Sequence, residues 1–375
     1  MKENHRRFIL AAVSIAAISI LAFLGANPGH AGERVSGYEV LAPITEGNLT
    51  VFPVVASHDR SHDTSAYLTL DDGIRSGNVV VTETGRIAPL LRRRPRTPLV
   101  PIPLPPQGGG AQVNQLVLVN NSDQPLILLA GEIVTGGKQD RVVGKDRIVP
   151  PKSDPISLDV FCVEPGRWVE RAANFKSMSS QMAQPSVRQR AMAAKSQQQV
   201  WDEVGKSAQA MRGAVAGAAA PAPPPTSSYA GVMESRAVRE HVDAVAMPVE
   251  RSYTSLIHEL RARSAVGVVV AVNGEIIWAD LFASTALLEK YWPKLIRSYA
   301  AEATTARAVD EKLDRPTVKS AQAFLEDLRG RHESVESEPG VYRNTEIQAD
   351  DFTVFVLTTL LPSSGFDLHV AKMAG

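Results

Sequence analysis

Cysteine is almost absent from the sequence, which contains only Cys162 among 375 residues. A single thiol excludes an intrachain disulfide, so the fold must be stabilised by packing and hydrogen bonding. Cys162 lies in an apolar run, residues 156–163, with no histidine near it in sequence. Since a catalytic thiolate needs a neighbouring histidine or a helix N-terminus, this pattern favours a small buried hydrophobic side chain.

Net charge is also absent, because 40 basic residues balance 40 acidic residues. A neutral chain has no long-range field that would attract nucleic acid, so no nucleic-acid partner is predicted. The sequence lacks a P-loop, a glycine-spaced dinucleotide fingerprint and a nucleophile elbow, and no cofactor is predicted. His58 and His62 lie close together in a polar connection, but no further ligand cluster accompanies them, so a solvated loop is favoured over a metal site.

The N-terminus has the pattern of a secretory signal. Basic residues within 2–7 precede an apolar run over 8–24, and small residues follow up to Ala31. These features predict a signal peptide over residues 1–31, cleaved after Ala31. The alternative is a retained membrane anchor, for which the run is slightly short of the roughly 20 residues that span a bilayer. Both interpretations predict an exported protein, periplasmic or extracellular, that contacts the membrane only if this segment is retained.

The remaining residues, 32–375, are predicted to form a single domain, because 44% apolar and 21% charged residues are ordinary for a globular protein. Residues 89–110 hold seven prolines and end in three glycines, which excludes a helix or a central strand and predicts an inserted loop. The arginines of that loop favour a solvated segment over contact with anionic lipid. Residues 213–228 are rich in alanine and proline and are predicted to form a linker.

Short apolar runs separated by turns fill the first half of the chain. Strands are expected at 49–55, 78–82, 140–149 and 156–163. A helical turn is expected at 70–74, and the runs 115–119 and 126–129 flank a polar turn that predicts a hairpin. Because no long helix separates these runs, antiparallel pairing is expected.

The apolar period lengthens after Trp168. Helices are expected at 185–211, 250–263, 284–302 and 316–330. Asn273-Gly274 joins the apolar runs 266–272 and 275–280 and suits a type I′ hairpin turn, whose centre needs positive φ. A last strand is expected at 352–361. The sum predicts an α+β fold in which a mostly antiparallel β N-terminal half packs with a helical C-terminal half.

Two polar segments carry the candidate ligand-binding residues. The first, 131–141, places three glycines around a polar cluster, and its candidates are Glu132, Lys138, Gln139, Asp140 and Arg141. Glycines let the backbone turn tightly and present N–H groups to an anion, while lysine and arginine supply positive charge. The second, 162–168, ends a predicted strand in a turn, and its candidates are Glu164, Arg167 and Trp168. Arginine beside tryptophan can pair with and stack on a planar or phosphorylated ligand.

These segments resemble the motifs of a known family. The run 131–141 followed by 162–168 is similar to the family named for its association with ADP-ribosylglycohydrolases and rhodanese-phosphatases. The turn at Asn273 and the segment Tyr291-Trp292-Pro293-Lys294-Leu295 are similar too, and the resemblance extends over about residues 38–300. The family name implies a link to NAD or ADP-ribose metabolism through neighbouring genes, but it implies no particular reaction. Most ADP-ribose chemistry is cytoplasmic, whereas this chain is expected to be exported.

Three functions fit these residues. The first is a binding module for a small polar or phosphate-bearing ligand, in which Arg141 and Arg167 pair with the anion and Gln139 contacts hydroxyl or amide groups; it requires the two segments to lie side by side. The second is an envelope scaffold whose polar motifs form internal salt bridges. The third is a hydrolase in which Glu132 or Glu164 acts as acid–base, which requires burial or proximity to separate their pKa values.

Overall fold

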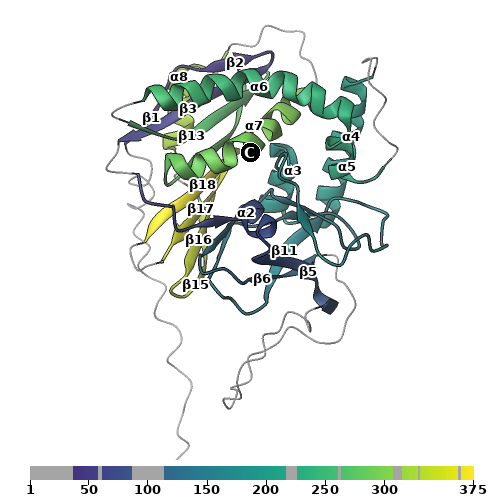
Figure 1. Cartoon of the computed structure of the whole chain (residues 1–375). Coiled ribbons are helices and arrows are strands. Elements are labelled where there is room, and N and C mark those ends of the chain that lie inside the picture. Colours follow the sequence, from purple (N-terminus) through teal and green to yellow (C-terminus); the bar gives the residue numbers. More distant parts are fainter. Residues whose placement is uncertain are drawn as a thin grey trace, which may run out of the picture.

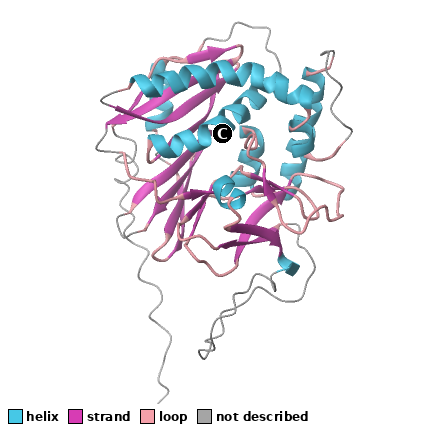
Figure 2. Cartoon of the chain, viewed as in Figure 1, coloured by secondary structure: helices cyan, strands magenta, loops and turns pink. Residues whose placement is uncertain are grey.

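The structure, a computed structural model, describes residues 37–57, 61–86, 114–216, 226–260, 263–306, 315–327, 330–361 and 365–375. The fold is α+β, with helices packed against mainly antiparallel sheets (Figures 1 and 2). The predicted signal segment 1–31 and the Pro-rich loop 89–110 lie outside the described residues, as do residues 217–225 of the predicted linker. Within the described ranges, no helix combines the length and apolar character needed to cross a membrane.

The largest sheet has nine strands and combines both ends of the chain. Its order is β1-β3-β13-β14-β18-β17-β16-β15, with β2 paired to β3, and every pairing is antiparallel. The strands are β1 (Tyr38–Val40), β2 (Ile44–Glu46), β3 (Leu49–Ser57), β13 (Arg263–Val272), β14 (Glu275–Phe282), β15 (His332–Glu338), β16 (Tyr342–Gln348), β17 (Phe352–Thr359) and β18 (Phe366–Ala374). The β13–β14 hairpin is confirmed, and Asn273 and Gly274 have φ angles of 52° and 85°, as a type I′ turn requires.

Two smaller sheets lie at the lower right of Figure 1. One has the order β12-β8-β9-β11-β6-β5, and its strands are β5 (Val79–Glu83), β6 (Gln115–Asn120), β8 (Ile133–Thr135), β9 (Arg141–Val143), β11 (Ile156–Cys162) and β12 (Lys176–Ser177). The other has the order β10-β7-β4, and its strands are β4 (Leu68–Thr69), β7 (Leu126–Leu128) and β10 (Arg147–Val149). The β4–β7 pair is parallel, which is an exception to the antiparallel pairing expected for this half.

Helices cover both faces of the nine-stranded sheet. The helices on this sheet are α6 (Arg236–Glu259) and α7 (Thr285–Thr305) on one face and α8 (Val318–Glu326) on the other. The remaining helices are α2 (Leu70–Arg75), α3 (Pro185–Gln189), α4 (Gln197–Ala214) and α5 (Tyr229–Met233), with short turns η2 (Thr84–Arg86) and η4 (Arg190–Ala194). Because successive strand residues point to opposite faces, Val268 and Val270 pack in the core shared with α6 and α7, whereas Val269 packs with Leu325 of α8. The sheet therefore supports two apolar cores.

The hairpin predicted between 115–119 and 126–129 is wrong. These runs form β6 and β7, which belong to different sheets, since β6 pairs with β5 and β11 while β7 pairs with β10 and β4. The amide of Asn120 donates to the carbonyl oxygens of Gln124 at 2.8 Å and Pro150 at 3.0 Å. These side-chain bonds replace ladder bonds at the end of β6 and direct the chain into the second sheet.

The helix predicted over 185–211 is interrupted. It consists of α3, the π-helical turn η4 and α4, and Lys195 between η4 and α4 has a left-handed φ of 50°. Ser196 then begins α4 by accepting a hydrogen bond from the N–H of Gln199 at 3.4 Å. The strand predicted over 140–149 is likewise two strands, β9 and β10.

The predicted split into a β N-terminal half and a helical C-terminal half is not confirmed. Six strands, β13 to β18, follow residue 262, and β3 of the N-terminal part pairs directly with β13. β15, β16 and β18 were not expected from the sequence. β18 lies between β14 and β17, so the last strand along the chain occupies the interior of the sheet.

Candidate functional site

The two polar segments lie side by side, as the binding hypothesis requires. Strand β9 pairs with β11, with Arg141 opposite Cys162. The first segment therefore ends where β9 begins, next to the point where β11 ends and the second segment begins. The amide of Gln139 donates to the carbonyl oxygen of Glu164 at 3.1 Å. Seven of the eight candidate residues meet here, and Glu132 is the exception.

Tight turns in the first segment depend on glycine. Gly136 and Gly137 have φ angles of 133° and 45°, a range that side chains with a Cβ rarely adopt. A methyl group on Gly137 would overlap the ring of Phe175 and lie 2.6 Å from the Oε1 atom of Glu83. The same Glu83 oxygen accepts a hydrogen bond from the N–H of Lys138 at 2.8 Å, which fixes the turn against β5.

Arg167 links the two segments through an internal ion-pair network. Its guanidinium lies 2.5 Å from the carboxylate of Glu164 and 3.4 Å from that of Asp140. It also donates to the carbonyl oxygens of Gly137 at 3.0 Å and Val169 at 2.6 Å. The side chains of Asp140, Glu164 and Arg167 are 4%, 2% and 12% exposed, so this network closes the turn from inside rather than offering its charges to solvent.

The proton affinities of these two carboxyl groups are shifted in opposite directions. Burial raises the pKa of Asp140, and a hydrogen bond from Ser228 at 2.7 Å only partly opposes this effect. Burial also acts to raise the pKa of Glu164, but hydrogen bonds from Arg167 and the Asp140 N–H, with the charge of Arg171, lower it overall. Glu164 is therefore held as the anion of the network.

Arg141 differs from the other charged candidates because its guanidinium is buried with almost no partner. The residue is fully buried, and its Nη1 donates only to the Asp140 carbonyl oxygen at 3.4 Å. Its Nε and Nη2 atoms have no hydrogen-bond partner among the described residues, and the same holds for the Oε1 atom of Gln139 and the Oε2 atom of Glu83. Burial lowers the pKa of Arg141. Unpaired donors and acceptors at this depth are energetically unfavourable.

Lys138 and Trp168 form the exposed side of the junction. The indole of Trp168 is 43% exposed, and the Lys138 Nζ atom lies 5.1 Å from its ring centroid. Arg171, whose side chain is 56% exposed, pairs with Glu164 at 3.2 Å on the same side. An accessible indole beside the ammonium of Lys138 is a surface on which a planar anion can stack and pair.

Glu132 belongs to a different cluster. Its carboxylate accepts from the Nζ atom of Lys294 at 2.5 Å and from the N–H of Leu129 at 2.8 Å. Lys294 also pairs with Asp71 at 2.9 Å, so two carboxylates share one ammonium on α7. Burial raises the pKa of Glu132, while the charge of Lys294 opposes that shift. Lys294 lies in the Tyr291 to Leu295 segment that carried part of the family resemblance.

A third buried cluster was not found from the sequence. Asp280 of β14 accepts two hydrogen bonds from Arg188 of α3, at 2.9 and 3.0 Å, and contacts the hydroxyl of Tyr299. The ring of His369 on β18 bridges Asp280 at 3.1 Å and Asp146 at 2.6 Å. Burial acts to lower the pKa of His369, but the two aspartates raise it to about 9, so the ring is an imidazolium at neutral pH. These residues lie far apart in sequence, and no local pattern marks them.

The polar connection around His58 and His62 is only partly described. His58 lies outside the described residues, and the ring of His62 stacks on Phe366 with centroids 4.1 Å apart. Within the described part of the chain, no group of three or more histidine, cysteine or acidic side chains could hold a metal ion together.

Fold and site together define an α+β domain whose glycine-rich polar motif closes on a neighbouring strand end through buried ion pairs. In a comparison with known protein families, residues 37–371 match the ARG and Rhodanese-Phosphatase-superfamily-associated Protein domain (ARPP-1), and the chain belongs to this family. The resemblance expected from the motifs is therefore confirmed, and the match continues beyond residue 300. No curated protein and no solved structure matches the chain.

Proposed function

We propose that the protein binds a small polar ligand carrying a phosphate or another anionic group at the junction of the two polar segments. The observation that supports this proposal is the buried guanidinium of Arg141, whose Nε and Nη2 atoms have no partner among the described residues. A bound anion would accept these donors, as a bidentate arginine–phosphate pair does. Gln139 offers an unpaired Oε1 acceptor beside it, and exposed Trp168 offers a stacking surface.

The roles expected for the two arginines now differ. Arg167 is already bonded to Glu164, Asp140 and three carbonyl oxygens, and it positions the turn. Arg141 is the arginine left to pair with an anion. A link to ADP-ribose or another nucleotide rests on the family name alone and is part of the proposal to be tested.

The test compares Arg141→Met with Arg147→Met. Thermal unfolding is measured with and without inorganic phosphate, ADP-ribose and ribose. We expect at least one anionic probe to raise the melting temperature of the wild type and of Arg147→Met, whose guanidinium already has partners in Ser157 and Glu338. Arg141→Met should lose this response. Its ligand-free stability should be equal to or above that of the wild type, because a nearly unpaired buried charge is removed.

An unchanged response in Arg141→Met, or no response of the wild type to any anionic probe, would refute the binding proposal. The scaffold hypothesis would then take its place, supported by the internal pairing of Glu132, Asp140, Glu164 and Arg167. The hydrolase hypothesis has one supporting feature, the raised pKa of Glu132, but Glu132 and Glu164 lie in different clusters and do not form one acid–base pair. It predicts turnover of an ADP-ribose, phosphoester or glycoside substrate that disappears in Glu132→Gln or Glu164→Gln.

Export is the second part of the proposal and rests on the sequence of residues 1–31. Cell fractionation followed by N-terminal sequencing should find a mature protein that begins at Gly32 outside the cytoplasm. A protein recovered with Met1 from the membrane fraction would favour the retained anchor, and a cytoplasmic protein would refute both forms.

A further inference from the structure

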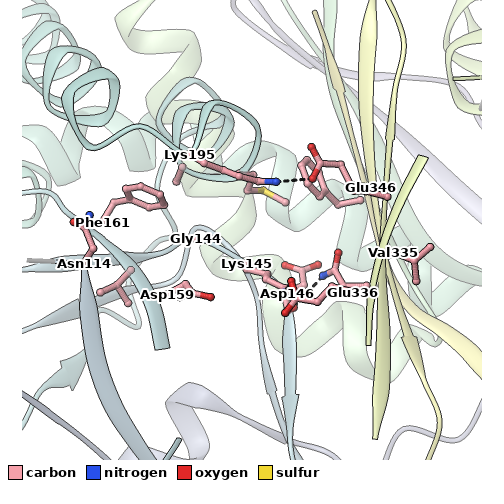
Figure 3. Close-up of a pocket in the computed structure, with 16 residues that line it drawn as sticks. Asn114, Gly144, Lys145, Asp146, Asp159, Phe161, Lys195, Val335, Glu336 and Glu346 are labelled. Atoms are coloured by element: carbon pink, nitrogen blue, oxygen red, sulfur yellow. Dashed lines mark hydrogen bonds and ion pairs between the residues drawn. The ribbon is translucent and has the colours of Figure 1, made fainter. Parts of the chain in front are cut away.

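A cavity of about 440 Å³ lies between the nine-stranded sheet and the smaller six-stranded sheet, away from the proposed anion site (Figure 3). One wall is formed by Asp159 and Phe161 of β11, and the facing wall by Glu336 of β15 and Glu346 of β16. The connection between β9 and β10, which includes Lys145, completes the lining from below. The volume is in the range of pockets that bind small molecules.

Two ion pairs cross this cavity, and in each pair one side chain is much less exposed than the other. Lys195 pairs with Glu346 at 2.6 Å, and their side chains are 58% and 10% exposed. Lys145 pairs with Glu336, and their side chains are 23% and 70% exposed. The less exposed charges of the two pairs are the carboxylate of Glu346 and the ammonium of Lys145. Each is covered by a long, solvent-exposed side chain that can swing away at little cost.

The strand register places the two ion pairs at different levels of the sheet, a separation that suits the two ends of a small zwitterion. Glu336 is directly opposite Asn344 across the β15–β16 pair, so Lys145 contacts the sheet at the level of Asn344. Glu346 lies two residues further on the same face of β16, a separation of roughly 7 Å along the strand. The amide of Asn344 donates to the Asp146 carbonyl oxygen at 3.0 Å, which holds the Lys145 connection against this strand.

An apolar surface accompanies the charges. Phe161 of β11, Met192 of η4 and Phe355 of β17 line the same cavity. Asp146, although part of the lining, is already bonded to Ala130 and His369 and is not available to a ligand. The cavity thus offers the carboxylate of Glu346, the ammonium of Lys145 and an apolar surface, and Asp159 adds a further carboxylate on the β11 wall.

We infer that this cavity is a second binding site, for an amino acid or short peptide with an apolar side chain. The ammonium group of the ligand would replace Lys195 at Glu346, its carboxylate would replace Glu336 at Lys145, and its side chain would contact Phe161 and Met192. Such an exchange leaves the charge of the cavity unchanged, so no buried charge loses its partner. A ligand with a single charge would break one ion pair without replacing the other.

The first experiment measures binding by isothermal titration calorimetry at pH 7 with L-phenylalanine, L-leucine and L-leucyl-L-alanine. The single-charge analogues 2-phenylethylamine and 3-phenylpropanoate serve as controls. We expect at least one zwitterion to bind and both analogues to bind at least about tenfold more weakly, since each forfeits one charge-assisted interaction. Absence of binding by all three zwitterions at millimolar concentration, or equal binding of either analogue, overturns the inference.

The second experiment uses variants of the four charged residues. Glu346→Gln and Lys145→Met should each weaken binding by about tenfold or more. Lys195→Ala and Glu336→Ala should strengthen binding about two- to fivefold, because the competing exposed side chain is removed. An ion pair with a purely structural role would not give this gain, and both exposed side chains can be truncated without opening the core. Unchanged affinity in Lys195→Ala and Glu336→Ala contradicts the inference.

A matched control is Glu240→Ala, which removes an exposed ion pair with Arg236 on the surface of α6 and should leave affinity unchanged. The inference is separable from the anion site. Arg141→Met should lose the response to anionic probes and keep zwitterion binding, whereas Glu346→Gln should show the reverse.

Discussion

Replacing Lys294 with methionine should destabilise the protein by about 3–5 kcal/mol, the range found when one partner of a buried ion pair is removed. Lys294 is 3% exposed, and its ammonium is shared by Glu132 and Asp71 at 2.5 and 2.9 Å. Methionine fills a similar volume, so the loss comes from the carboxylate of Glu132 that is left buried without its counter-ion. Burial already raises the pKa of Glu132, and the charge of Lys294 is the main opposing influence.

The assay is urea unfolding followed by tryptophan fluorescence, in a double-mutant cycle with Glu132→Gln. Glutamine keeps an acceptor for the Leu129 N–H but carries no charge, so Lys294→Met combined with Glu132→Gln should be more stable than Lys294→Met alone. The coupling energy should be at least about 1.5 kcal/mol. The single variant should also recover stability as the pH falls, because the folded state then protonates Glu132 more readily than the unfolded chain does. Additive effects within about 0.5 kcal/mol, with no pH dependence, would refute this reasoning.

Three further predictions follow from buried groups. The pKa of His369 is raised from 6.5 to about 9, so the imidazolium stabilises the fold by about 3 kcal/mol below pH 6.5. This stabilisation is lost as the pH rises through 9. In urea unfolding, His369→Gln should abolish this decline of the unfolding free energy with pH. Burial lowers the pKa of Lys372 from 10.5 to about 8, so the contribution of this group to the unfolding free energy rises with pH instead of falling. The wild type should gain stability relative to Lys372→Met between pH 8 and 10.5, and a constant difference over that range would contradict the assignment. Gly137→Ala should lower the free energy of unfolding by about 2 kcal/mol more than Gly47→Ala does. Both glycines have positive φ, but a methyl group would meet Phe175 and Glu83 only at Gly137, whereas nothing lies within 4 Å of it at Gly47. Equal losses in the two alanine variants would show that the contacts contribute nothing beyond backbone strain.

Local patterns predicted the parts of the fold that are determined by neighbours in sequence. Asn273-Gly274 requires positive φ at two successive residues, and few structures other than a type I′ hairpin satisfy that requirement. The adjacency of 131–141 and 162–168 follows from the antiparallel pairing of β9 with β11, which are close in sequence although β10 of another sheet lies between them. The family resemblance was also correct, because the motifs that carry it are short and contiguous in sequence.

Long-range order could not be predicted in this way. β18 enters the sheet between β14 and β17, and its apolar residues indicate a buried strand without specifying its neighbours. The partners of the candidate charges are equally distant, since Glu132 and Lys294 are 162 residues apart in sequence. A glutamate in a glycine-rich turn has the same sequence signature whether it binds a ligand or an internal lysine. Only the arrangement of α7 against β8 decides between them.

The buried charges of this protein fall into two physical classes, and the distinction bears on function. Glu132 with Lys294, Glu164 with Arg167, and Asp280 with Arg188 are each paired within about a hydrogen-bond length. Each pair joins elements that are separate in the chain or fixes a turn, a role that buried ion pairs can have without adding net stability. Arg141 has no such pair, although it lies in the same motif. A buried cation with so few hydrogen bonds is costly to retain in the ligand-free fold, although the nearby charges of Glu83 and Asp140 offset part of that cost. The binding proposal would account for the remaining cost through an anion that pairs with Arg141.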